Sequence, residues 1–158
     1  MKIKIYSRRA IEALLSRGRL EGFAVISFHD PIGRGRRSGE DYAPIDFTGR
    51  CDRVMQIAIH DLDPEVLYEF GLSEESYFPE ADELAKFIYD AKNDGLGIIC
   101  QCEYGQSRSA ACAAAILQHF EKRGIDIFAD FRYYPNQLVY HKVFDALTRY
   151  SNTKSNTN

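Results

Sequence analysis

The sequence predicts a single α/β domain in which a central, mostly parallel β-sheet is flanked by helices. Its 158 residues suit one domain with a substantial buried core. Short apolar runs rich in β-branched residues alternate along the chain with longer segments whose apolar residues recur at helical spacing. A strand that is apolar throughout needs cover on both faces, and helices give that cover in parallel sheets.

Four short segments have the composition of strands. The two most apolar, FAVISF at residues 23–28 and GIICQ at 97–101, are typical of buried strands, and we expect the first to be central. The other two are the alternating segment 2–6 and RVMQIAI at 53–59.

Helix signals separate these strands. Ser7 is a good N-cap for a helix that Gly18 can end, and Pro79 suits the first turn of a helix that reaches about residue 93. After an irregular aromatic segment at 126–135, Asn136 can cap a last helix that ends near Leu147. We also expect a helical turn at 65–70 and an Ala-rich helix at 110–120.

We place the folded domain at residues 1–150. Residues 151–158, SNTKSNTN, contain nothing apolar to bury, and we expect them to form a disordered tail.

The bulk composition excludes several classes of protein. A formal net charge of -3 gives no reason to expect nucleic acid or an anionic membrane as a partner. No apolar run approaches the roughly 18 residues of a membrane span, and the first residues lack the apolar core of a signal peptide. We therefore expect a cytoplasmic protein; nothing in the sequence favours a particular oligomeric state.

The four cysteines fit a reducing compartment. They show neither paired C-x-x-C spacing nor accompanying histidines, so we expect no metal site. Buried, inert thiols are the favoured interpretation of the cysteines outside the motif described next. A second cysteine close to a reactive one can instead form a protective disulfide after oxidation.

The segment CEYGQSRS, residues 102–109, carries the chemistry. Cys102 stands at the end of a predicted strand, Arg108 follows six positions later, and Ser109 opens the Ala-rich helix. A loop that leads from a strand into a helix N-terminus turns backbone N–H groups inward and forms a site for an anion such as phosphate. Gly105 lets the backbone curl, and the guanidinium of Arg108 can bind two phosphate oxygens at once.

A thiolate beneath a bound phosphate is placed for in-line attack on phosphorus, which gives a phosphocysteine intermediate. We therefore predict that Cys102 is the nucleophile and that Ser109 stabilises the sulfur as it leaves. The predicted substrate-binding residues are those of the loop, with the first two at its rim: Glu103, Tyr104, Gly105, Gln106, Ser107 and Arg108.

This loop resembles the signature of the cysteine-dependent protein tyrosine and dual-specificity phosphatases, in which cysteine, five residues, arginine and Ser or Thr recur. The chain is most similar to the small dual-specificity type, and YYPNQLVY at 133–140 resembles bacterial members. The resemblance implies a protein phosphatase that needs no metal or cofactor. One departure is Gln101, because the family usually has histidine immediately before the cysteine.

The resemblance also implies a phosphorylated protein or peptide as substrate. The loop between Cys102 and Arg108 has no lysine, whereas phosphoinositide-directed relatives usually carry basic residues there. We therefore favour phosphotyrosine, with phosphoserine, phosphothreonine and small metabolites as open alternatives.

A phosphatase of this kind needs a carboxylic acid that protonates the leaving oxygen. Asp61 directly follows the strand at 53–59, and strand ends of a parallel sheet meet at the edge where Cys102 also lies. In the small phosphatases the acid holds this place, so we favour Asp61 and keep Asp63 and Asp30 as alternatives. The distance from Asp61 to Cys102 is longer than usual for the group, which an insertion around 65–76 would explain.

Two other functions remain open. Gln101 motivates a non-catalytic phosphate-binding module, a pseudophosphatase, and the same Cys-to-Arg spacing occurs in sulfur-transfer and arsenate-reducing enzymes. The arginines Arg34, Arg36 and Arg37 lie in a long polar loop that either attracts a phosphorylated partner or is merely solvated.

Overall fold

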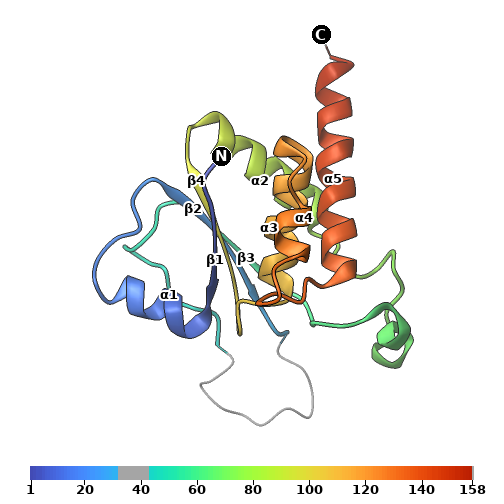
Figure 1. Ribbon diagram of the computed structural model, residues 1–158, viewed down its shortest axis with the longest axis horizontal. Helices are drawn as coiled ribbons and strands as arrows, with labels where there is room; N and C mark the ends of the chain where they lie inside the picture. Colours follow the sequence, from blue (N-terminus) through green and yellow to red (C-terminus); the bar gives the residue numbers. More distant parts are fainter. Residues whose placement is uncertain (32–42, 158) are drawn as a thin grey trace.

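The computed structural model describes residues 1–31 and 43–157, and within them four parallel strands form one sheet (Figure 1). The spatial order of the strands is β1-β4-β2-β3. Their bounds are Ile3–Ser7 for β1, Phe23–His29 for β2, Val54–Ala58 for β3 and Gly97–Cys102 for β4. The predicted α/β architecture is confirmed, and the two most apolar strands, β2 and β4, are the central pair.

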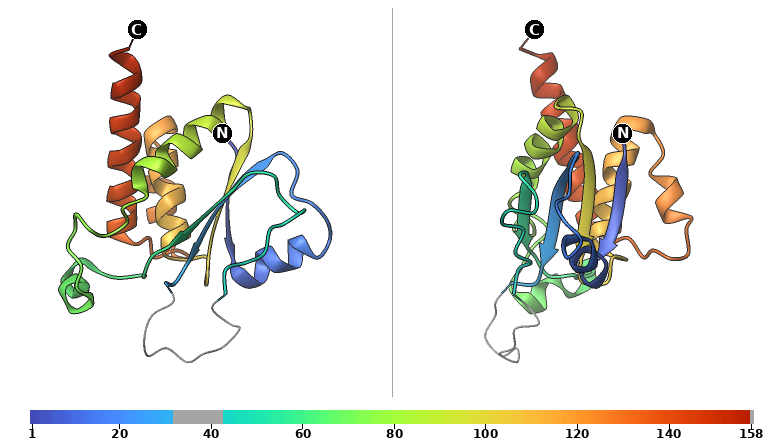
Figure 2. Two further views of the ribbon diagram at one scale, coloured as in Figure 1. Left: turned by 180° about the vertical axis from the view of Figure 1, so that it is seen from behind. Right: turned by 90° about the vertical axis from the view of Figure 1, so that its left-hand side faces the viewer.

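Helices cover both faces of this sheet unequally (Figures 1 and 2). On one side lie α2 (Ala81–Asn93), α3 (Arg108–Glu121) and α5 (Gln137–Ser155), and on the other lies α1 (Arg8–Leu15). Alternate residues of β2 serve the two sides: Ala24, Ile26 and Phe28 join the larger core, and Val25 joins the smaller one. This division explains why β2 is apolar almost throughout.

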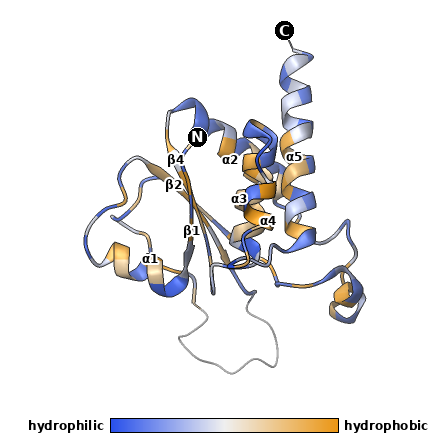
Figure 3. Cartoon of the chain, in the orientation of Figure 1, coloured by the Kyte–Doolittle hydropathy of each residue, from blue (hydrophilic) through white to orange (hydrophobic). Residues whose placement is uncertain are grey.

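The helix α3 lies close to the sheet because its inner surface is made of small side chains. Its alanines are completely buried, and α5 packs against both α3 and α2. Figure 3 shows apolar residues along the strands and α3, whereas the last turns of α5 are hydrophilic. The described helices include none long and apolar enough to cross a membrane.

The C-terminal end of the chain departs from the prediction. The helix α5 continues to Ser155, past Leu147, and residues 151–155 are helical where we expected a disordered tail. Tyr150 anchors this extension, since its ring packs on that of Tyr89 with centroids 4.8 Å apart. Beyond it, backbone hydrogen bonds and hydroxyl contacts to preceding carbonyls continue the helix. The domain limits of 1–150 stay a prediction.

Two shorter segments are also helical. The expected turn is the 3₁₀ helix η2 (Pro64–Phe70), and the aromatic segment after α3 contains one helical turn, α4 (Ile125–Phe128), where we expected irregular structure.

Candidate active site

The loop between β4 and α3 lies at the carboxyl edge of the sheet and is held by the junction of β1 and α1. The backbone N–H of Arg8 donates to the carbonyl of Glu103 at 3.0 Å. Gly105 has a φ of +68°, and a Cβ there would stand 2.6 Å from the backbone nitrogen of Ser7. Only glycine fits this position, because both the conformation and the space exclude a side chain.

The thiol of Cys102 lies at the floor of this loop, where it is 3% exposed. Its Sγ is 3.0 Å from the Oγ of Ser109, which is fully buried in the first turn of α3. The hydroxyl is therefore within hydrogen-bond reach of the sulfur.

Arg108 is 4% exposed and lies at the start of α3. Its Nη1 donates to Asp30 Oδ1 at 2.8 Å and to the carbonyl of Ile59 at 2.6 Å. Its Nε is buried without a hydrogen-bond partner among the described residues. A buried guanidinium with an unused donor suits an oxyanion ligand, since an unsatisfied buried donor is costly.

Asp61, which follows β3, also contacts the loop between β4 and α3. Its Oδ1 accepts hydrogen bonds from Ser107 Oγ at 2.7 Å and from Asn136 Nδ2 at 2.8 Å. The alternative acid Asp63 is exposed at the start of η2, and Asp30 is the ion-pair partner of Arg108. Asp30 thus contacts the loop through its arginine, whereas Asp61 accepts from the hydroxyl of Ser107 within the loop.

Gln101 occupies the place before the cysteine and is buried beneath the loop, 2% exposed. Its Oε1 accepts a hydrogen bond from Ser27 Oγ, and its Nε2 donates to the carbonyl of Cys102 at 2.9 Å. The amide thus links β2 to the backbone at the nucleophile without carrying charge.

Two titratable neighbours are held in their neutral forms. Burial, with Arg108 nearby, lowers the pKa of His29 below its ordinary value. Burial and the charge of Asp61 raise the pKa of Tyr77, whose hydroxyl donates to the carbonyl of His60 at 2.6 Å. These groups add no charge to the candidate site near neutral pH.

The remaining predicted residues form the rim. Glu103 is half-buried, and Tyr104 and Gln106 are exposed, Tyr104 by 79%. The carbonyl of Gln106 accepts a hydrogen bond of 2.8 Å from the backbone N–H of Tyr134. The arginines Arg34, Arg36 and Arg37 lie outside the described residues.

Of the other cysteines, Cys100 and Cys112 are completely buried and Cys51 is half-buried. All four thiols are free. A hydrogen bond with Cys112, together with complete burial, raises the pKa of Cys100 well above its ordinary value. The thiol of Cys100 therefore stays protonated and unreactive. Within 1–31 and 43–157, no three His, Cys, Asp or Glu side chains gather as a metal site.

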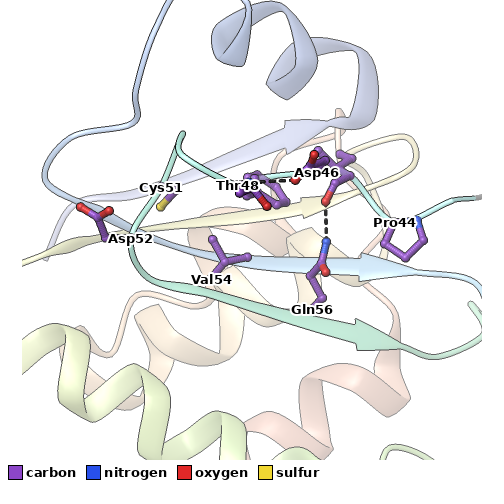
Figure 4. A pocket seen from close by; sticks show the side chains of 9 residues that line it. Pro44, Asp46, Thr48, Cys51, Asp52, Val54 and Gln56 are labelled. Atoms are coloured by element: carbon purple, nitrogen blue, oxygen red, sulfur yellow. Dashed lines mark hydrogen bonds between the residues drawn. The ribbon is translucent and has the colours of Figure 1, made fainter.

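A cavity of about 510 Å³ lies elsewhere, between β3 and the segment that precedes it (Figure 4). Its wall includes Gln56, whose Nε2 donates to the carbonyl of Ile45, and Asp46, which accepts from the N–H of Thr48. None of the predicted site residues lines it.

Comparison with known proteins identifies the fold of this chain. No protein-family profile matches the sequence, and no curated protein is similar to it in sequence. Human DUSP28 is structurally similar over 96% of this chain and 94% of its own, with 16% identity and a TM-score of 0.55. The chain therefore has the fold of the dual-specificity phosphatases.

Two further solved structures are similar to this chain. A mouse putative dual specificity phosphatase, crystallised with zinc tungstate, covers 96% of this chain and 86% of its own, at 18% identity and a TM-score of 0.54. The human tyrosine phosphatase-like serine/threonine/tyrosine-interacting protein covers 92% of this chain and 87% of its own, at 17% identity and a TM-score of 0.54. The likeness establishes the phosphatase fold.

Sequence reasoning missed three participants. The sequence suggests Asp30 only as a possible acid and Asn136 only as a helix cap, and it gives no sign of the contact made by the Ser27 hydroxyl. A signal existed for Asp30, because it follows a central strand as Asp61 follows its neighbour.

Proposed function

We propose that this protein is a cysteine-dependent phosphatase that hydrolyses phosphotyrosine in proteins or peptides through a phosphocysteine intermediate. The observation that carries the proposal is the buried guanidinium of Arg108, whose Nε has no hydrogen-bond partner among the described residues. Arg108 ends the loop that begins at the thiol of Cys102. A nucleophile and a vacant oxyanion donor on one loop are what phosphoryl transfer to sulfur needs.

In the first step the thiolate of Cys102 attacks phosphorus, and the bond to the leaving oxygen breaks. Arg108 and the N-terminal amides of α3 stabilise the charge of the transferring group. Asp61 gives its proton to the leaving oxygen. Its hydrogen bond to Ser107 supports this role, because it holds the carboxyl beside the phosphate loop.

In the second step water attacks the phosphocysteine. Asp61, now a carboxylate, takes a proton from that water, and the sulfur leaves with the bonding electron pair. The Oγ of Ser109, 3.0 Å from Sγ, can donate a hydrogen bond to the departing thiolate. Inorganic phosphate is released and the thiolate is restored.

The depth of the nucleophile supports an aryl phosphate as substrate. Cys102 is 3% exposed, so a long side chain such as phosphotyrosine reaches it more easily than phosphoserine does. The exposed rings of Tyr104 and Tyr134 beside the loop offer aromatic surface to such a side chain.

The test is hydrolysis of p-nitrophenyl phosphate by the purified, reduced protein in EDTA. We expect turnover in wild type, none with Cys102→Ser, and a smaller loss with Asp61→Asn, because p-nitrophenolate leaves well without a proton. Turnover that survives Cys102→Ser would refute the mechanism. A wild type that binds phosphotyrosine peptides without turnover would instead support the binding module.

A further inference from the structure

The amide of Asn136 lies where three parts of the candidate site meet. Asn136 is 6% exposed. Its Nδ2 donates to Asp61 Oδ1 at 2.8 Å and to the carbonyl of Leu62 at 2.9 Å, and its Oδ1 accepts from the N–H of Val139 at 2.9 Å. Both amide protons and the amide oxygen are therefore used.

These partners fix which end of the amide faces Asp61. The N–H of Val139 can only donate, so it requires the amide oxygen, and the carbonyl of Leu62 can only accept, so it requires the amide nitrogen. The group that faces Asp61 is thus a donor. An amide turned the other way would break both contacts.

A second contact ties Asn136 to the phosphate loop. Its backbone N–H donates to the carbonyl of Ser107 at 3.3 Å, and the Oγ of Ser107 donates to Asp61 Oδ1 at 2.7 Å. Asp61, Ser107 and Asn136 therefore form a closed ring of hydrogen bonds. The ring joins the segment after β3, the loop and the N-cap of α5.

We propose that Asn136 is a positioning residue that fixes the general acid of the reaction, an inference that rests on the proposed phosphatase function. Two donors occupy Oδ1 of Asp61, so Oδ2 is the oxygen that carries the transferable proton. In the first step this Oδ2–H bond breaks, its proton passes to the leaving oxygen, and the electron pair of the broken P–O bond stays on that oxygen.

The solvent exposure of Asp61 explains why such a clamp matters. An exposed carboxyl is free to change rotamer, and proton transfer requires a fixed approach to the leaving oxygen. The amide, together with the hydroxyl of Ser107, removes that freedom. It acts from the N-cap of α5, an element that is itself packed on α3 and α2.

Two substitutions separate this role from helix capping. Asn136→Ser and Asn136→Asp both keep an oxygen that can accept from the N–H of Val139, and both lose the amide donor to Asp61. We compare kcat/KM for phenyl phosphate, whose leaving group needs a proton, with kcat/KM for p-nitrophenyl phosphate, whose leaving group does not.

We expect both variants to lose about 10- to 100-fold on phenyl phosphate and less than about threefold on p-nitrophenyl phosphate, a fraction of what a general acid contributes. In an Asp61→Asn background, neither substitution should cause a further loss on phenyl phosphate, because the proton donor is already gone. Two residues that act as a unit are not additive.

Val143→Ala is the matched control for lost stability. Val143 is buried on α5 and is 1% exposed. It lies seven residues after Asn136, beyond the N-cap that contacts Asp61. It should lower the thermal midpoint without changing the ratio of the two substrates.

The outcomes distinguish this inference from the proposed function. If both Asn136 variants lower kcat/KM by the same factor for the two substrates, so that the ratio stays unchanged as in Val143→Ala, the positioning role is wrong. The phosphatase function then still stands. A loss that persists undiminished in the Asp61→Asn background also overturns it. If wild type shows no Cys102-dependent turnover of either substrate, the proposed function fails first and the role of Asn136 falls with it.

Discussion

Nη1 of Arg108 donates to Oδ1 of Asp30 across 2.8 Å, an ion pair that joins the first residue of α3 to the residue after β2. The two side chains are 5% and 20% exposed. The guanidinium that we assign to phosphate is therefore already held by an internal carboxylate. An incoming phosphate meets an arginine fixed in place, and it also meets the negative charge of Asp30.

We predict that Asp30→Asn lowers the free energy of unfolding by about 1.5–3 kcal/mol, because a largely buried arginine loses its hydrogen bond to a charged partner. We also predict that inorganic phosphate raises the thermal midpoint more in this variant than in wild type, because the carboxylate no longer repels the anion. Ligand that binds only the folded state stabilises it by mass action.

Asp82→Asn is the control for this prediction. Asp82 pairs with Arg149 on exposed side chains of α2 and α5, so its loss removes an aspartate–arginine pair without touching the loop. It should leave the shift caused by phosphate unchanged. A smaller phosphate shift in Asp30→Asn than in wild type would contradict our account of the ion pair.

Gly105→Ala should be more damaging than a comparable glycine substitution elsewhere. The left-handed conformation costs alanine about 1–2 kcal/mol, and the clash with the backbone of Ser7 adds to it. Gly71 has nearly the same φ, +69°, with nothing within 4 Å of the added Cβ. Gly71→Ala therefore measures the conformational cost alone.

Urea unfolding and p-nitrophenyl phosphate turnover test the pair. We expect Gly105→Ala to lose more stability than Gly71→Ala and to lose most of its activity, whereas Gly71→Ala stays active. Equal stability of the two variants would mean that the loop moves aside from β1 at little cost.

We expect the amide of Gln101 to stabilise the fold because it satisfies two buried polar groups, the Ser27 hydroxyl and the Cys102 carbonyl. Gln101→Leu leaves the Ser27 hydroxyl and the Cys102 carbonyl unsatisfied in the core, at a cost of about 1–3 kcal/mol. Adding Ser27→Ala should recover part of this loss, because it removes one stranded polar group. A double variant whose loss equals the sum of the two single losses would show that the residues do not interact.

The sequence predicted the parts of this site that lie close together along the chain. The loop from Cys102 to Ser109 follows from local spacing, and the place of Asp61 follows from the rule that parallel strand ends share an edge. The contact of Arg108 with Asp30 spans 78 positions and depends on how β2 aligns with β4, which no local pattern encodes.

The same reasoning explains the other surprises. Asn136 is a good helix cap in any setting, so its second function as a donor to Asp61 leaves no separate trace in the sequence. The extension of α5 depends on Tyr150 meeting Tyr89, a contact between residues of two helices far apart in the chain. Local propensity predicts neither.

Stability should fall as the pH drops below about 6.5, the ordinary pKa of histidine in an unfolded chain. Burial lowers the pKa of His29 and of His119 in the folded state. In this range the unfolded chain therefore binds protons that the folded chain does not, which favours unfolding. Above about pH 7 these two histidines are neutral in the folded and in the unfolded chain, so they cause no pH dependence of stability there.

Urea unfolding between about pH 7.5 and 5.5 measures this effect while carboxylates remain ionised. His119 contacts the hydroxyl of Tyr89 at 2.7 Å and lies on α3 away from the loop, and His119→Gln keeps an acceptor there. The variant should show a shallower decline than wild type. A decline as steep as that of wild type would remove His119 from the explanation.

The most direct test of the account is to trap the phosphocysteine. Wild type and Cys102→Ser are mixed with p-nitrophenyl phosphate, quenched in acid within milliseconds, digested, and analysed by mass spectrometry. We predict one phosphoryl group on the wild-type peptide that carries Cys102 and none on the corresponding peptide of the variant. Turnover without any phosphorylated Cys102 peptide, or phosphorylation at another residue, would contradict the central claim.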